Sequence, residues 1–219
     1  MCTLRQWCQP ALLLSLFGFA VPLYAQSTFE LIPFVAYYRP TGSFGPTVET
    51  ATWLPTTPSD LSAIAWGVEA RSWGGGRLGI SLKAALATST MNRQVPPPVG
   101  SVAVAGSTDR IAAQILVVTV QAQYDLSPRV GDYHAWIGAG PALVRHGGDV
   151  YAAFGPAVDY GGALGVGMDF RVSRQLRATL GAESLLYQLC VVNASSGNTV
   201  ERGFQIDLLL RAGLSWHGK

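Results

Sequence analysis

The sequence predicts an all-β protein: an eight-stranded, antiparallel, up-and-down β-barrel that crosses a membrane. Three observations support this prediction. The chain is poor in charge, it lacks apolar runs long enough for membrane helices, and six of its segments alternate between apolar residues and small or polar ones. Of its 219 residues, 13% are charged and 49% are hydrophobic, whereas a soluble domain carries about a quarter charged residues.

A membrane protein built from helices would also be poor in charge. Each of its helices, however, would need about 18 or more consecutive apolar residues. Beyond the N-terminal region, the longest apolar candidate runs only from Ile111 to Val120 and includes Gln114 and Thr119. The chain therefore favours strands over helices as the elements that cross the membrane.

The N-terminal region has the features of a cleavable signal peptide, predicted for residues 1–25. Arg5 is its only charged residue, an apolar stretch follows from Ala11 to Val21, and residues 23–25 resemble a small-residue cleavage site. The alternative is an uncleaved membrane anchor, but the apolar stretch is short for a membrane span. The remaining residues, 26–219, are predicted to form one β-barrel domain.

Six segments of the mature chain alternate with the period of two that a β-strand requires. One face of each is apolar and the other is small or polar, as in strands that separate lipid from the lumen of a barrel. The residues predicted to face lipid are Ile64, Trp66, Val68, Leu78, Ile80, Leu82, Leu86, Leu116, Val118, Val120, Ala122, Tyr124, Leu164, Val166, Met168, Phe170, Val172, Leu176, Ala178, Leu180, Ala182, Phe204, Ile206, Leu208, Leu210, Ala212, Leu214 and Trp216.

Two further strands are predicted with less regular patterns. Residues 29–38 are mixed and contain Pro33, which suits an edge or a bulge. Residues 135–144 are rich in glycine and contain Pro141, so their faces stay unassigned. Together with the six regular segments they give the eight strands of the predicted barrel.

The connections between these strands alternate between long and short. Outer-membrane barrels have short periplasmic turns and longer extracellular loops, so this order places every long connection outside the cell. The long connections are predicted at residues 39–61, 89–109, 146–159 and 189–203, and the short ones at residues 74–77, 127–133 and 173–175.

The architecture of residues 29–216 resembles that of the small eight-stranded outer-membrane barrels, which include the OmpA-like transmembrane domain and the OmpX-like and OmpW-like proteins. The resemblance is carried by the glycine-rich strands at residues 136–141 and 161–169 and by the closing strand at residues 208–216. It implies export through the periplasm into the outer membrane of a Gram-negative bacterium. The partners it implies are outer-membrane lipid, lipopolysaccharide and the outer-membrane assembly machinery. That machinery reads an aromatic residue at the end of such barrels; here Trp216 is followed by His217, Gly218 and Lys219, a departure from that pattern.

Ten charged residues are predicted to face the lumen. They are Glu69, Arg71, Lys83, Asp125, Asp169, Arg171, Arg177, Glu183, Asp207 and Arg211. An eight-stranded barrel is just wide enough for its own side chains to fill, and interior charges must be paired to be tolerated. We therefore expect a lumen plugged by salt bridges. The alternatives are a narrow polar pore or gate and, less favoured, a catalytic carboxylate cluster.

The sequence offers no set of residues typical of catalysis, a metal site or a cofactor site. His134 lies beside a predicted periplasmic turn, and His146 begins a predicted extracellular loop, where a histidine is usually solvated. With His217 and Cys190 they form no recognisable metal-ligand set. The formal net charge of +2 gives no indication of nucleic-acid binding.

Ten aromatic residues lie mostly near the predicted strand ends, where interfacial girdles form in membrane barrels. They are Tyr37, Tyr38, Trp66, Trp73, Tyr133, Trp136, Phe170, Tyr187, Phe204 and Trp216. We expect them to form such girdles as a set.

Two functions follow from this architecture, and neither is enzymatic. The first is a structural or surface-interaction protein that binds an extracellular ligand through its long loops, while the barrel anchors it. The alternative is a porin-like narrow channel for small or apolar solutes, which the OmpW-like resemblance suggests and which requires a lumen that is not fully plugged.

Overall fold

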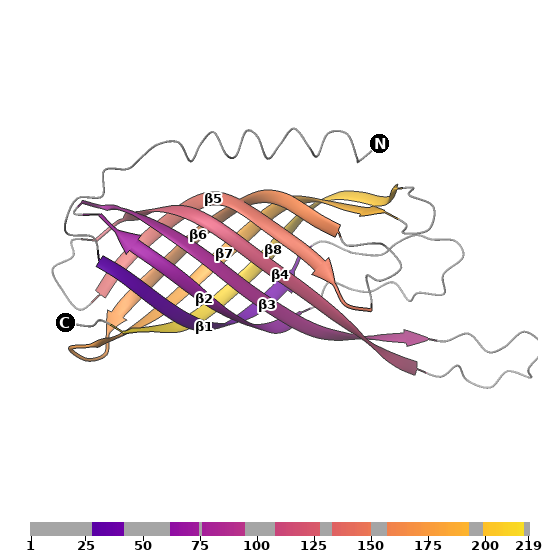
Figure 1. The fold of residues 1–219 in the computed structure, drawn as a ribbon, viewed down its shortest axis with the longest axis horizontal. Helices are drawn as coiled ribbons and strands as arrows, with labels where there is room; N and C mark the ends of the chain where they lie inside the picture. Colours follow the sequence, from indigo (N-terminus) through magenta and orange to yellow (C-terminus); the bar gives the residue numbers. More distant parts are fainter. Residues whose placement is uncertain are drawn as a thin grey trace, which may run out of the picture.

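The computed structural model is a closed barrel of eight β-strands (Figure 1). The structure describes residues 28–41, 62–74, 76–94, 108–127, 133–149, 157–192 and 199–216. The signal peptide predicted for residues 1–25 and its cleavage site lie outside the described residues. No helix among the described residues is long and apolar enough to cross a membrane.

Each strand pairs antiparallel with its neighbours in the sequence, and the first strand pairs with the last to close the sheet. The up-and-down, all-antiparallel topology predicted from the sequence is thereby confirmed. The strands are β1 (Thr28–Pro40), β2 (Ala63–Trp73), β3 (Leu78–Gln94), β4 (Thr108–Asp125), β5 (Tyr133–Gly147), β6 (Ala157–Arg171), β7 (Leu176–Val192) and β8 (Thr199–Trp216).

The two strands with irregular patterns also alternate strictly in space. In β1, Ile32 and Phe34 are buried inside the barrel while Leu31 and Val35 are exposed on its outer face. Both faces of β1 are therefore apolar, which conceals the alternation in the sequence. In β5, the pairing with β4 is interrupted next to Pro141, which has no backbone N–H to offer to the ladder.

Short turns close the barrel at one end, which we call the periplasmic end because small outer-membrane barrels have short turns there. In the β2–β3 turn, Gly74 N donates to Leu78 O at 3.1 Å. In the β6–β7 turn, Ser173 Oγ accepts from Leu176 N at 3.1 Å. The opposite end, which we call the outer end, carries the other four connections.

The predicted long connection at residues 189–203 is wrong in its extent. Strand β7 continues to Val192 and β8 begins at Thr199, so only residues 193–198 separate them. This connection is no longer than the one between β4 and β5, at residues 126–132. Strands that continue past the apolar belt lose their apolar face, so the sequence pattern no longer distinguishes them from a loop.

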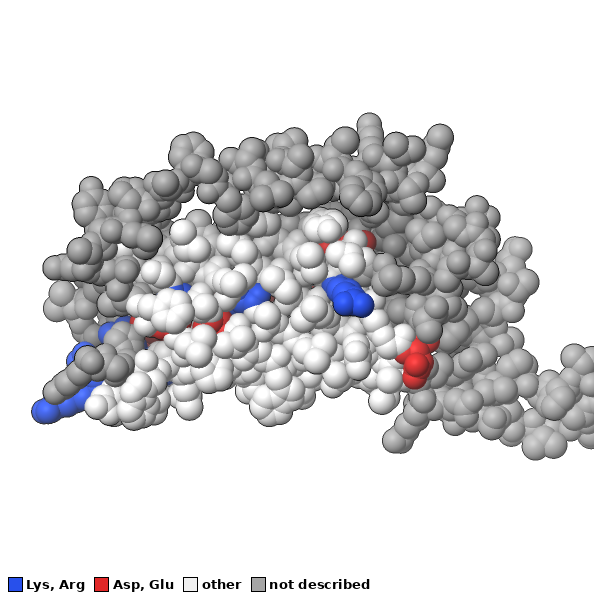
Figure 2. Space-filling view, in the orientation of Figure 1, with Lys and Arg blue, Asp and Glu red and all other residues white. Residues whose placement is uncertain are grey.

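The outer surface of the barrel is apolar. Large hydrophobic side chains such as Trp66, Leu78, Leu164 and Phe204 are each more than half exposed. The face shown in Figure 2 carries few charged side chains. Exposed apolar area of this extent marks a membrane-facing or interaction surface, and its distribution over the strands is the one that a lipid-facing belt requires.

The aromatic girdle is smaller than predicted. Six of the ten aromatic residues are exposed on the outer face, but Tyr38, Trp73, Trp136 and Tyr187 are at most 4% exposed and lie in the lumen. Their positions in the alternation point them inward, which proximity to a strand end does not reveal. These four side chains contribute to the interior described next.

Candidate functional site: the barrel lumen

The lumen has three layers along the barrel axis. The order follows from the strands, because on each contributing strand the residues of the plug lie nearer the periplasmic end than the apolar residues of the collar. The plug consists of Glu30, Glu69, Arg71, Lys83, Gln121, Gln123, Asp125, His134, Trp136, Asp169, Thr179, Glu183 and Arg211. The collar consists of Phe34, Ala36, Ala63, Ala65, Ala85, Ala87, Ala113, Ile115, Val117, Ala142, Val144, Ala163, Leu185, Leu189 and Leu209. The outer cluster consists of Tyr38, His146, Asp159, Tyr187 and Asp207.

Glu69 on β2 is the centre of the plug. It is fully buried, and its carboxylate pairs with two guanidinium groups: Arg71 Nη2 at 3.2 Å, and Nη1 of Arg211, which reaches over from β8. Gln123 Nε2 donates to Glu69 Oε1 at 3.2 Å. Three donors thus compensate one buried carboxylate, as a buried charge requires.

Two ion pairs cross the lumen between opposite strands. Arg71 on β2 lies 2.7 Å from Asp169 Oδ2 on β6. Lys83 on β3 pairs with Glu183 on β7, and Lys83 Nζ also donates to Gln121 Oε1 at 3.0 Å. Each pair joins strands on opposite sides of the eight-stranded sheet, so the plug ties the barrel together across its diameter.

Trp136 lies among the three cations of the plug. The indole ring centroid is 5.1 Å from Arg71 Cζ, 5.3 Å from Arg211 Cζ and 6.0 Å from Lys83 Nζ, all within cation–π range. The indole also fills the space opposite Gly167 on β6, where a Cβ atom would meet its ring. Glycines on the lumen face thus make room for the large side chains of the plug.

The outer cluster joins five strands near the outer end. Tyr187 Oη donates to Asp207 Oδ2 at 2.6 Å, and Tyr38 Oη donates to the same oxygen. His146 Nδ1 lies 3.3 Å from Asp159 Oδ2, and its Nε2 lies 3.5 Å from Tyr187 Oη. The expectation that His146 is a solvated loop residue is wrong, because β5 extends to Gly147 and carries the ring into the lumen.

The structure places nine of the ten predicted lumen charges inside the lumen or at its edge and corrects the placement of one. Eight are buried, and Arg177 is half-buried near the periplasmic end. Arg171 is exposed, which contradicts its predicted lumen position. It has the inward position in the alternation, but it is the last residue of β6, where the strand leaves the barrel wall.

The ten predicted lumen charges comprise five acidic and five basic residues, and the structure does not keep this balance. Two buried carboxylates were missed: Glu30, on the irregular strand β1, and Asp159, assigned to a loop end. Counting the alternation of β6 back from Asp169 finds Asp159, whereas β1 offers no clear alternation from which to find Glu30. Among the described residues, the buried charged side chains are Glu30, Glu69, Asp125, Asp159, Asp169, Glu183 and Asp207 against Arg71, Lys83 and Arg211.

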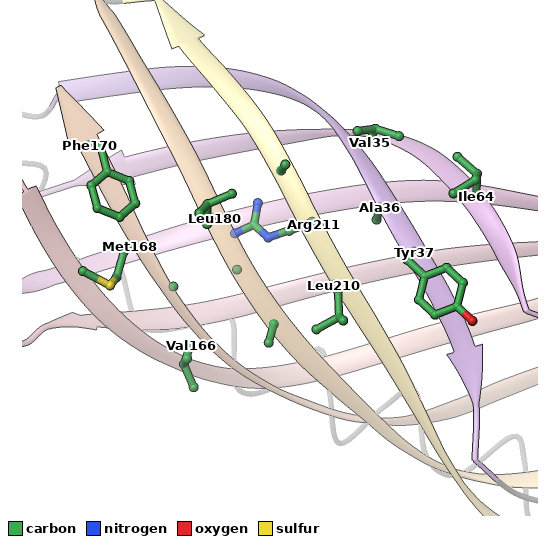
Figure 3. A pocket seen from close by; sticks show the side chains of 14 residues that line it. Val35, Ala36, Tyr37, Ile64, Val166, Met168, Phe170, Leu180, Leu210 and Arg211 are labelled. Carbon is green, nitrogen blue, oxygen red and sulfur yellow. The ribbon is translucent and has the colours of Figure 1, made fainter. Parts of the chain in front are cut away.

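A groove crosses the outer face above Arg211 (Figure 3). It has a volume of about 570 Å³ and runs over β1, β6, β7 and β8, between side chains such as Tyr37, Leu180 and Leu210. Arg211 lies over Gly181, whose missing side chain leaves the wall thin at this point. The apolar lining makes the groove part of the lipid-facing belt. Within the described part of the chain, no group of three or more His, Cys, Asp or Glu side chains could hold a metal ion.

Comparison with known proteins shows the same architecture in solved structures. No protein-family model and no curated protein matches the sequence. The outer membrane protein OprG from Pseudomonas aeruginosa is similar with a TM-score of 0.55 and 13% identity, over 89% of this chain and 97% of OprG. Neisserial surface protein A is similar with a TM-score of 0.51 and 13% identity, over 88% of this chain and 99% of that protein.

At this level of identity the similarity establishes the fold and leaves the function of the chain open. The fold agrees with the features of the chain itself: a closed eight-stranded antiparallel sheet, an apolar outer face and a polar, salt-bridged interior. A bilayer provides suitable surroundings for such an exterior. The chain therefore has the fold of the small eight-stranded outer-membrane β-barrels.

Proposed function

We propose that this protein is a plugged outer-membrane anchor that presents its outer end for interaction with a partner at the cell surface. The observation that carries the proposal is the plug. Glu69 and Arg71 are fully buried, and ion pairs join β2 to β6 and β3 to β7 across the lumen. A lumen crossed in this way favours a rigid support over an open pore.

The outer end offers one defined surface for such a partner, the ribbon formed by residues 90–94 of β3 and 108–112 of β4. These residues pair with one another from Thr90↔Ala112 to Gln94↔Thr108. Among the described residues, the β2–β3 pairing stops at Ala87 and the β4–β5 pairing begins at Gln114. The ribbon therefore extends beyond the sheet with an edge on each side (Figure 1).

An edge of this kind binds extended peptide segments through backbone hydrogen bonds. The proposed extracellular ligand is therefore a protein segment that adds a strand to the ribbon, with the neighbouring loops giving specificity. The remaining proposed partners are outer-membrane lipid, lipopolysaccharide and the assembly machinery. The proposal assigns no catalysis: beside the Asp159–His146 pair lies the phenol of Tyr187, which is already bonded to Asp207.

The decisive experiment is single-channel recording in a planar bilayer with the refolded chain lacking residues 1–25. Folding is checked first by faster migration on an unheated gel. The plugged anchor predicts no steady openings from folded protein. Reproducible openings would contradict the proposal. A proline variant of the ribbon, Asn92→Pro, tests the partner surface: it should keep the folded mobility and reduce attachment of whole cells to the surfaces that wild-type cells bind.

A second candidate function, a narrow channel for small or apolar solutes, is favoured by the collar. Eight of the collar residues are alanines, and their small side chains leave more room in this part of the lumen than in the plug. They are Ala36, Ala63, Ala65, Ala85, Ala87, Ala113, Ala142 and Ala163. Such a channel would also need an exit past the plug or through the wall. Uptake of a small apolar solute into liposomes, absent in an Ala85→Phe variant, would support it.

A further inference from the structure

Both ring nitrogens of His134 face carboxylate oxygens at the periplasmic end of the plug. Nδ1 lies 2.8 Å from Asp169 Oδ2 on β6, and Nε2 lies 3.2 Å from Asp125 Oδ2 on β4. A neutral imidazole carries one N–H and one lone pair, so it can donate to only one of these oxygens. The geometry therefore fits the doubly protonated ring, which donates to both.

The two carboxylates are held in place by other groups. Thr179 Oγ1 donates to Asp169 Oδ1 at 2.7 Å, and Arg71 Nη1 lies 2.7 Å from the oxygen that His134 contacts. Ser127 N donates to Asp125 Oδ1 at 3.1 Å. Both oxygens therefore stay in position when the ring loses a proton, and the nitrogen left with a lone pair then faces a negative oxygen.

The side chains that face His134 from the neighbouring strands are acidic or aromatic. Asp125 on β4 and Asp169 on β6 face it directly, and Trp73 on β2 lies edge-on, with ring centroids 5.0 Å apart. Farther out, Arg71 lies 4.0 Å from Glu30 on β1 and 3.2 Å from Glu69. Among the buried side chains at this end of the plug, four carboxylates meet two guanidinium groups, those of Arg71 and Arg211, while Arg177 is half-buried at the same end.

We propose that His134 is a proton-operated latch at the periplasmic end of the lumen. In its doubly protonated form the ring ties β5 to β4 and β6, and through Asp169 to Arg71 on β2. Loss of one proton turns one of the two contacts from attraction to repulsion and releases β5 on that side. The latch goes beyond the proposed function, because it requires neither a partner nor conduction.

The first test measures the protonation state directly. Proton–carbon NMR spectra of the refolded chain in detergent micelles, with labelled histidine, are recorded from pH 5 to pH 9, and the His134 signal is assigned by its loss in His134→Gln. The latch predicts the chemical shifts of an imidazolium at pH 6 and a pH-dependent change above it. A neutral ring throughout this range would overturn the proposal.

The second test measures how much the His134 contacts contribute to the thermal stability of the barrel. The temperature at which half of the protein loses its folded mobility on an unheated gel is compared at pH 6 and pH 9. For the wild type we expect a fall of roughly 4 °C or more, the scale on which losing one such contact acts in a chain of this size. His134→Gln, which keeps one donor and cannot take up a proton, should lose at least half of this fall.

Two further variants separate the latch from other causes of pH dependence. His146→Gln removes the other lumen histidine, at the outer end, and should keep the whole fall. Asp125→Asn keeps His134 but removes one of its two carboxylates, and should lose at least half of it. The latch would be refuted if the midpoint temperature of both His134→Gln and Asp125→Asn fell between pH 6 and pH 9 as much as that of the wild type. It would also be refuted if only His146→Gln lost this decrease. If His134→Gln fails to refold, Asp125→Asn and the NMR titration still decide the question.

Discussion

Two parts of the lumen, the plug and the collar, fill the interior of the barrel with opposite kinds of side chains. Both lie inside one eight-stranded barrel, yet the plug is filled mostly by charged, polar and aromatic side chains and the collar mostly by alanines and branched aliphatic residues. The stability of the plug depends on specific hydrogen-bond and ion-pair partners, whereas that of the collar depends on how well its apolar side chains fill the available volume. The comparison teaches that substitutions of similar size should have very different effects in the two parts.

The largest effect is expected when the centre of the plug is removed. Glu69→Ala deprives both Arg71 and Arg211 of a buried carboxylate, and breaking a buried pair in this way costs about 3–5 kcal/mol. Unfolding in urea, followed by gel mobility, measures the loss. The matched change in the collar, Leu209→Ala, removes a buried side chain without leaving a charge. A cost for Glu69→Ala no larger than that for Leu209→Ala would break the distinction between the plug and the collar.

A slightly smaller effect is expected on the outer face, where neither the plug nor the collar is touched. Leu208 lies between the lumen-facing Asp207 and Leu209 and therefore faces lipid. Leu208→Arg places a charge in the apolar belt at a cost of about 2–4 kcal/mol. The measurement is assembly of the refolded variant into lipid vesicles, which we expect to be impaired relative to the wild type. Normal assembly of this variant would mean that the facing assignment of β8 is incorrect.

Packing within the plug gives the next effect. A Cβ atom at Gly167 would meet the Trp136 ring and the backbone oxygen of Leu180, so Gly167→Ala displaces the indole, strains the contact with β7 and should cost about 1–3 kcal/mol. Gly162→Ala, on the same strand, is the control: its Cβ would meet no atom closer than 3.8 Å. Equal unfolding midpoints for the two variants would show that the plug does not depend on this contact.

The smallest effect is expected in the outer cluster. Tyr38→Phe removes one of the two phenols that donate to Asp207 Oδ2, while Tyr187 keeps its hydrogen bond at 2.6 Å. The expected cost is about 0.5–1.5 kcal/mol, measured by the same urea titration. A cost as large as that of Glu69→Ala would place the outer cluster beside the plug as a second energetic centre.

The sequence predicts the fold well because the period of two is a direct consequence of strand geometry. The six regular strands show the predicted faces, with Arg171 at the end of β6 as the exception. Strand β1 could not be assigned, because Phe34 and Val35 are both apolar although one faces the lumen and the other lipid. Where both surroundings are apolar, hydrophobicity carries no information about facing.

The composition of the lumen was harder to predict than its walls. Positions such as Glu69 and Asp207 could be assigned to the lumen from alternation, but partners such as Arg211 for Glu69 and Tyr38 for Asp207 come from strands far away in the sequence. His134 and His146 were read as end residues because the strand limits of β5 lie beyond the predicted ones. The identity of a buried partner depends on the tilt and register of the closed sheet, which single-strand patterns do not encode.

The ion pairs that span the barrel have a consequence for how the protein reaches its final form. Lys83 and Glu183 are 100 residues apart in the chain, Arg71 and Asp169 are 98 apart, and Glu69 and Arg211 are 142 apart. None of these pairs can form in a partly assembled sheet, and their charges cannot enter hydrocarbon alone. Strand closure and charge burial must therefore occur together as one late step of folding, limited by the slow search that contacts between distant residues require.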